Sequence, residues 1–146
     1  MANITPHGLQ YSVIEHLRNK TNLNVDWIYD GYKMREGETF MTVKEMQSNY
    51  EYIVKLRESV NVINRFQVGL HATSESERSR KEDEIRRLLT FDRIPYIDTE
   101  VSSDKVCGYL DVYLRNVTPM SSSHITDKSS HHTVYFDIEI DTIIRR

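Results

Sequence analysis

The stretch that decides the fold lies near the end of the sequence, HTVYFDIEIDTII at residues 132–144. Every second position is apolar over most of its length, which predicts a β-strand with one buried face: Val134, Phe136, Ile138, Ile140 and Ile144. At ~3.3 Å per residue such a strand spans about 40 Å. A compact domain of 146 residues has a radius of gyration of roughly 15 Å. The strand is therefore predicted to cross the whole domain or to project beyond it.

Two further segments are predicted to pair with this strand. In residues 60–71 one face carries Val60, Val62, Phe66, Val68 and Leu70, and the other carries Asn61, Arg65, Gln67 and His71. Asn64 is a polar exception on the apolar face. Leu110, Val112 and Leu114 face one way in a strand that precedes the last one. The polar, serine-rich segment 119–131 joins these two strands and is too long for a tight hairpin turn.

Shorter extended segments are predicted elsewhere. Residues 25–31 alternate apolar and polar side chains, residues 39–46 do so more weakly, and residues 50–56 do so clearly. Residues 94–97 form a short extended piece that Pro95 places at a sheet edge.

Two helices are predicted from their start signals. Thr5 is placed to cap the first helix, over residues 5–20, with Pro6 at a position where a missing N–H is tolerated. Ser74 and Glu77 form a capping box for the second. That helix is apolar only near its end, through Ile85, Leu88 and Leu89, so its first two turns have nothing to bury.

These elements predict one α+β domain over residues 1–146, with an antiparallel sheet of about four to six strands, two helices packed on one side and a long C-terminal β-hairpin. The net charge of −3 comes from interspersed acidic and basic residues, which disfavours a nucleic-acid binder that works by phosphate neutralisation. One cysteine cannot form an internal disulfide. No apolar run approaches the roughly 18 residues that span a bilayer, and no signal peptide is recognisable, so synthesis and folding in the cytoplasm are expected.

Projecting strands expose unpaired edges, which favour aggregation unless a partner covers them. A symmetric ring, in which each subunit pairs with the next, removes those edges. The length of the last strand therefore predicts a ring-shaped homo-oligomer.

A metal site is one interpretation of the polar segment and the strand after it, because imidazole and carboxylate suit zinc and similar ions. Its ligands would be His124, Asp127, His131 and His132. Adjacent histidines on a strand point to opposite faces, and nothing else fixes a metal geometry. A solvated loop is favoured, with a metal-dependent hydrolase using His124, Asp127 and His131 as the alternative.

Three carboxylates, Asp137, Glu139 and Asp141, share the polar face of the last strand. They are read as the wet face of an antiparallel sheet, or in a ring as an acidic lumen that does not trap passing DNA. Cys107 has no local base to activate it and is expected to be a buried or edge thiol. The tyrosines are expected to pack within the sheet: Tyr29, Tyr50, Tyr52, Tyr109, Tyr113 and Tyr135. No constellation indicates an enzyme, so neither a catalytic residue nor a cofactor is predicted.

One long stretch resembles a known group of proteins: FMTVKEMQSNYEYIVKLRESVNVINRFQVGLHATSESERSRKEDEIRRLL at residues 40–89, followed by FDRIPY at residues 91–96. It is similar to head–tail joining proteins of phages of Gram-positive bacteria, of the tail-completion or tail-terminator type. The resemblance implies an N-terminal helix, antiparallel strands, a charged helix and further strands. It also implies a structural virion protein: a hexameric ring that caps the tail tube and joins it to the head connector.

The partners follow from that resemblance, and the contacts from the polar and charged surfaces that docking in such an assembly needs. The partners would be further copies of the chain, the tail tube protein and a head connector or stopper, with DNA only passing through the lumen and no membrane. The location would be the head-proximal end of the tail, after assembly in the host cytoplasm. Another head–tail joint or tail tube component is the alternative within this class. The expected subunit or docking contacts are Arg78, Arg80, Lys81, Glu82, Ser121, Ser122, Ser123, His131 and His132.

Overall fold

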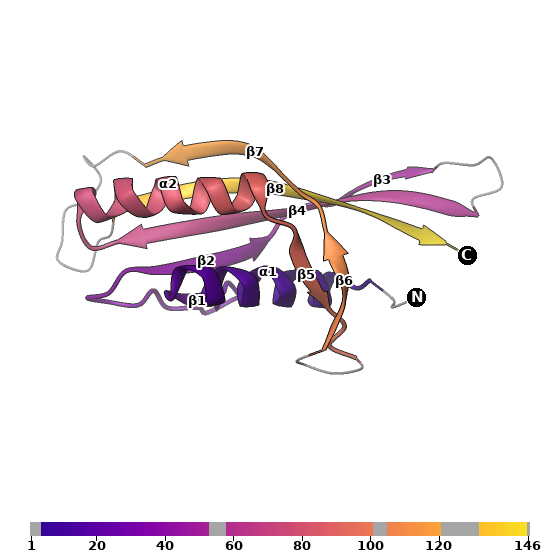
Figure 1. Cartoon of the computed structure of the whole chain (residues 1–146), viewed down its shortest axis with the longest axis horizontal. Coiled ribbons are helices and arrows are strands. Elements are labelled where there is room, and N and C mark those ends of the chain that lie inside the picture. Colours follow the sequence, from indigo (N-terminus) through magenta and orange to yellow (C-terminus); the bar gives the residue numbers. More distant parts are fainter. Residues whose placement is uncertain (1–3, 53–57, 101–104, 121–131, 146) are drawn as a thin grey trace.

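The computed structural model describes residues 4–52, 58–100, 105–120 and 132–145. The elements follow one another in the order shown in Figure 1: α1 (Pro6–Thr21), β1 (Asn24–Trp27), β2 (Phe40–Glu45), β3 (Asn49–Tyr52), β4 (Ser59–Ala72), α2 (Glu75–Phe91), β5 (Ile94–Ile97), β6 (Val106–Leu110), β7 (Val112–Pro119) and β8 (His132–Arg145).

Two 14-residue strands, β4 and β8, form the centre of the main sheet. They are antiparallel and stay in register over their full length, from Ser59 opposite Arg145 to Ala72 opposite His132. The prediction of an unusually long final strand is therefore confirmed. The sheet order is β1-β2-β4-β8-β7, and β3 pairs with β4 beyond the end of β2.

The α+β fold class with a six-stranded main sheet and a C-terminal hairpin of β7 and β8 is confirmed. One pair departs from the antiparallel pattern, because β1 runs parallel to β2. A separate two-stranded sheet of β5 and β6 packs through β5 on α1.

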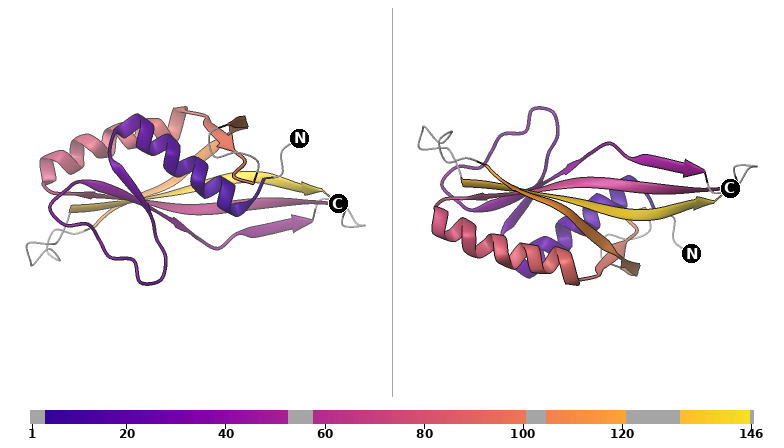
Figure 2. Two further views of the ribbon diagram at one scale, coloured as in Figure 1. Left: turned by 90° about the horizontal axis from the view of Figure 1, so that it is seen from below. Right: turned by 90° about the horizontal axis from the view of Figure 1, so that it is seen from above.

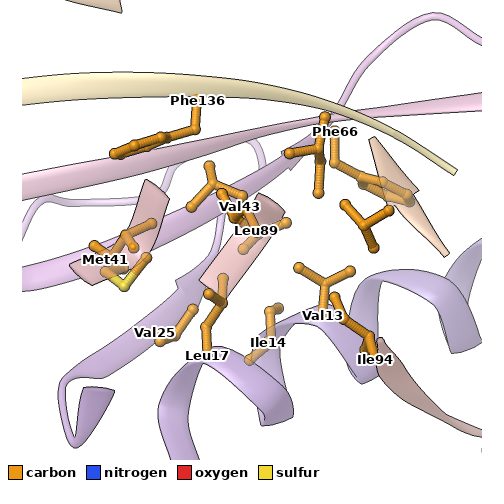
Figure 3. Close-up of a cluster of buried hydrophobic side chains, with 14 of the residues drawn as sticks. Val13, Ile14, Leu17, Val25, Met41, Val43, Phe66, Leu89, Ile94 and Phe136 are labelled. Atoms are coloured by element: carbon orange, nitrogen blue, oxygen red, sulfur yellow. The ribbon is translucent and has the colours of Figure 1, made fainter. Parts of the chain in front are cut away.

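Both helices lie on the same side of the main sheet, as predicted, whereas the segment between β1 and β2 lies on the other side (Figure 2). The core fills the space between the helices and the sheet. Figure 3 shows Val13, Ile14 and Leu17 of α1 pointing toward the side chains of the sheet. Where the helices cover the sheet, the apolar even-numbered residues of β4 and β8 belong to this core, including Phe66, Val68, Phe136, Ile138 and Ile140, all at most 2% exposed. Full burial of one such side chain contributes about 1.5–3 kcal/mol.

The first helix begins and ends as its sequence signals indicate. The Thr5 hydroxyl accepts a hydrogen bond from the Gly8 amide at 3.0 Å, and Pro6 occupies the first helical position. Asn22 ends the helix in the left-handed conformation, with φ of 59°.

The second helix begins with the predicted cap, in which Ser74 Oγ accepts from the Glu77 amide at 3.2 Å. The Glu77 carboxylate reaches back to the Thr73 hydroxyl at 3.1 Å. Only Ile85 and Leu89 of this helix are buried, so the prediction that its first two turns have nothing to bury is confirmed, although Arg78 and Lys81 are partly covered.

Two strand predictions were wrong in their extent. The strand predicted over residues 25–31 ends at Trp27, and the chain turns away through Gly31, which has φ of 85°. The strand predicted through Leu110, Val112 and Leu114 is two strands separated at Asp111. The residues before Asp111 pair with β5 and those after it pair with β8. The predicted strand over residues 50–56 is confirmed as far as Tyr52, and residues 53–56 lie outside the described part.

Candidate functional site

One end of the main sheet extends past both helices as a ribbon of three strands (Figure 1). We define the ribbon as β3, residues 59–63 of β4 and residues 141–145 of β8, which are joined by continuous antiparallel pairing. Strand β7 does not reach the ribbon, because its pairing with β8 begins at Val112 opposite Ile140. The ribbon thus ends the sheet with β3 at one edge and β8 at the other, within the part of the chain that the structure describes.

Large side chains are exposed on both faces of the ribbon. Tyr50 is 58% exposed and Ile144 is 52% exposed, and both project on the face that is buried elsewhere in the sheet. Tyr52, at 60%, lies on the same face, while Ile143, at 50%, lies on the other. The apolar face of the sheet therefore continues beyond the helices that cover it. Contiguous apolar surface of this kind marks interaction sites.

The prediction that the tyrosines pack within the sheet was wrong for most of them. Tyr29, Tyr109 and Tyr113 are 64%, 61% and 45% exposed, in addition to the two tyrosines of the ribbon. Tyr135 alone of the six is partly buried. Cys107 is exposed in β6, a strand of the small sheet, which fits the expectation of an edge thiol rather than a buried one.

The polar face of the sheet brings two arginines to the predicted acidic stripe. Glu139 lies 3.3 Å from Arg115 Nε and 3.9 Å from Arg65 Nε. Asp137 accepts a long hydrogen bond of 3.4 Å from Gln67. These residues line a hollow of about 200 Å³. The face around the stripe therefore carries both signs of charge, and its assignment to a lumen stays a prediction.

Strand β7 has an irregularity at Arg115. The register with β8 shifts between Leu114 and Asn116, so Arg115 is the extra residue. Its guanidinium lies 5.2 Å from the centre of the Tyr113 ring. The alternating pattern of this strand already places Arg115 on the polar face. No sequence signal revealed the bulge, which instead brings Val117 to the apolar face.

The charged residues predicted as subunit contacts on α2 already pair within their own helix. Arg78 contacts Glu82 at 3.2 Å and Glu75 at 3.9 Å, and Lys81 contacts Glu84 at 3.1 Å. Arg80 is exposed. Partly exposed pairs of this kind at a surface contribute about 0–1 kcal/mol each, so the helix face can exchange partners at low cost.

The remaining predicted contacts belong to the segment before β8. Ser121, Ser122, Ser123 and His131 lie outside the described residues, as do the candidate metal ligands His124 and Asp127. His132 is the first residue of β8 and is half-buried. No group of three or more metal-binding side chains occurs among the described residues, which leaves the metal-site interpretation untested.

A second cluster, which sequence reasoning missed, fixes the segment between β1 and β2. The Asp26 carboxylate accepts bonds from Tyr32 Oη at 2.6 Å and from Arg35 Nε and Nη2 at 2.6 and 2.9 Å. Partial burial raises the pKa of Asp26, but these hydrogen bonds outweigh burial and hold it below its ordinary value. The same burial and the bond to Asp26 raise the pKa of Tyr32.

Serine, histidine and aspartate also meet near the N-terminal helix, but in a packing role. His16 Nε2 lies 3.1 Å from Asp92 Oδ2. Ser12 Oγ donates to the Gly8 carbonyl at 2.7 Å and accepts from the Ile97 amide at 2.9 Å. The serine hydroxyl therefore joins α1 to β5 through two backbone groups.

Comparison with known protein families and with curated proteins found no match to this chain. None of the helices in the described ranges has the length and apolar character needed to cross a membrane.

Proposed function

We propose that this protein is a structural subunit of a phage head–tail joint, of the tail-completion or tail-terminator type. In this role copies of the chain form a ring that caps the tail tube and joins it to the head connector. The proposal rests on the resemblance of residues 40–96 to such proteins together with the architecture of the domain. Such a protein works by the fit of its ring faces to the tail tube and the head connector, which requires no catalytic residue.

The single observation that carries the proposal is the uncovered ribbon. A monomer that leaves Tyr50, Ile143 and Ile144 about half exposed, beside strand edges that no described residue pairs with, has an aggregation-prone surface. In a closed ring each subunit covers this surface of its neighbour, and no ribbon edge stays unpaired. The exposed ribbon thus favours a protein whose working form is a symmetric assembly.

The polar face fits a docking role within that assembly. Arg65, Arg115, Glu139 and Asp137 give this face a mixed pattern of charge around a shallow hollow. Mixed polar surfaces of this kind are typical of contacts between preformed proteins, where charge sets orientation more than affinity. The tail tube and the head connector are the partners that the resemblance implies.

Negative-stain electron microscopy of the purified protein tests the proposal. The expected images show discrete rings of one diameter, with hexamers favoured by the resemblance. Long fibres would instead indicate a tail tube subunit, the alternative within the same class. Single small particles at every concentration, together with chelator-sensitive hydrolysis, would replace the proposal with the metal-dependent hydrolase.

A further inference from the structure

The two edges of the ribbon are related in a way that allows one copy of the chain to continue the sheet of the next. Strand β3 is antiparallel to β4, and β4 is antiparallel to β8, so β3 and β8 run in the same direction. The edges lie at the same level, since Val60 is opposite both Tyr52 and Ile144. We infer that residues 141–145 of one copy pair in parallel with β3 of a second copy, which joins neighbouring ribbons into one continuous sheet.

A head-to-tail arrangement uses both edges, whereas a two-fold one does not. If β8 paired with β8 of a partner, the contact would close at a dimer and leave both β3 edges uncovered. When β8 of each copy pairs with β3 of the next, an open row of copies has a free β3 edge at one end and a free β8 edge at the other. Those two edges meet when the row closes into a ring. This inference rests on the proposed ring and specifies the contact that forms it.

Side chains on the two faces match in this arrangement. A register shift by one residue would exchange the faces, so only even shifts keep apolar next to apolar. At zero shift Ile144 lies beside Tyr52 of the second copy, on the face that continues the core. Pairs of aromatic and β-branched residues across neighbouring strands stabilise sheets. Ile144 of one copy and Tyr52 of the next, neither of which is covered by a helix, would thereby shield each other from solvent.

Charges on the opposite face match as well. At zero shift Ile143 is level with Glu51 of the second copy, because both are aligned with Asn61 in their own ribbons. Arg145 is two residues further along the same face, so it lies diagonal to that Glu51. The diagonal neighbour is within reach of a long side chain. Glu51 and Arg145 are both exposed, and their opposite charges favour this partner.

Disulfide trapping tests the contact directly. In a Cys107→Ser background, Glu51→Cys and Ile143→Cys are combined, and the protein is oxidised and run on a non-reducing gel. Within one copy these positions are two strands apart, about 10 Å, which is too far for a disulfide. Between copies they are adjacent, so a ladder of multimers that ends at one closed size is expected. Glu51→Cys combined with Thr90→Cys, an exposed position on α2, is the matched control.

The charge match is tested by exchange. Glu51→Arg or Arg145→Glu alone is expected to raise the concentration at half-assembly roughly threefold, the effect of one exposed ion pair. The double variant, Glu51→Arg with Arg145→Glu, is expected to return the concentration at half-assembly to that of the unchanged protein. No ladder beyond that of the control, or no restoration by the double exchange, would overturn this contact. Rings seen by microscopy with no ladder would reject the contact and keep the proposed function, whereas monomers without a ladder would reject both.

Discussion

Gly8 lies where helix α1 meets β5, and a methyl group there has no room. A Cβ at this position would come within 2.5 Å of the Tyr96 hydroxyl oxygen and 3.1 Å of its ring. Tyr96 is 3% exposed, and its hydroxyl accepts a bond from the Thr5 amide at 3.1 Å, so the ring is buried and its hydroxyl is fixed.

Gly8→Ala is therefore expected to destabilise the protein by about 1–3 kcal/mol, although alanine favours the helix by roughly 0.5–1 kcal/mol. Urea unfolding followed by circular dichroism measures the difference. Gly108→Ala is the control, because a Cβ there meets nothing within 4 Å. Equal stability of the two variants would show that α1 and β5 are not packed as described.

Asn64 is a buried polar residue on the apolar face of β4, and its partners explain it. Its amide donates to the Ile140 carbonyl at 2.9 Å and to the Thr142 hydroxyl at 3.0 Å. Removal of a buried donor costs about 1–3 kcal/mol. Asn64→Ala is expected to lose that much stability in thermal unfolding, and Gln67→Ala, on the polar face, less than about 0.5 kcal/mol. A neutral effect of Asn64→Ala would mean that its side chain is solvated instead.

The carboxylate of Asp26 makes the segment at residues 28–39 sensitive to acid. Its pKa is lowered in the folded protein, so the stabilisation is fully present above the unfolded value of about 3.9 and is lost as pH falls through the folded value. Trp27 is the only tryptophan and the neighbour of Asp26. Its fluorescence is expected to change below about pH 4. This acid transition should be absent from the Asp26→Asn variant. An identical acid titration of both proteins would contradict the role of this carboxylate.

At the level of elements, the strands with a long alternating pattern and the helices with clear caps were predicted correctly. Alternation along β4 and β8 extends over more than two typical strands of about 5–6 residues, and both helices have caps that the structure retains. The break at Asp111 was missed for a physical reason. Leu110 and Val112 both face the same core, so their alternation continues while the strand changes partner.

The candidate site was predicted in part for the same reason. The polar face of β8 and the places of Arg65 and Arg115 follow from alternation. The bulge in β7, after which Val117 faces the core, is not encoded by alternation. The exposure of Tyr50 and Ile144 was missed because the composition of a strand does not indicate where the helix layer ends. That boundary is a tertiary property, set by the packing of α1 and α2 on only part of the sheet.

The ribbon is expected to matter for assembly and little for the stability of one copy. Tyr50→Ser combined with Ile144→Ser removes two side chains that are more than half exposed. We expect the free energy of unfolding to change by less than about 1 kcal/mol and oligomers to be lost in size-exclusion chromatography. Ile138→Ala, at a position that is 0% exposed, should instead cost about 2–5 kcal/mol. Retained oligomers in the double variant would exclude the ribbon as the contact.

At the level of the whole molecule, the described structure combines a covered body with an uncovered extension. The two central strands run through both, so the core that folds the body also holds the ribbon in place (Figure 1). A rigid extension of this kind presents its edges in a fixed orientation. That orientation is what a closed assembly needs, because each contact must repeat with the same rotation.

Native mass spectrometry of the intact protein tests the central claim most directly. A single closed oligomer is predicted, with a mass that is a whole multiple of the 17.3 kDa chain and six copies favoured by the resemblance. The ring should dissociate to folded monomers when Tyr50 and Ile144 are both replaced by serine. A stable monomer at every accessible concentration, with the ribbon open to solvent, would contradict the claim that other copies complete this sheet.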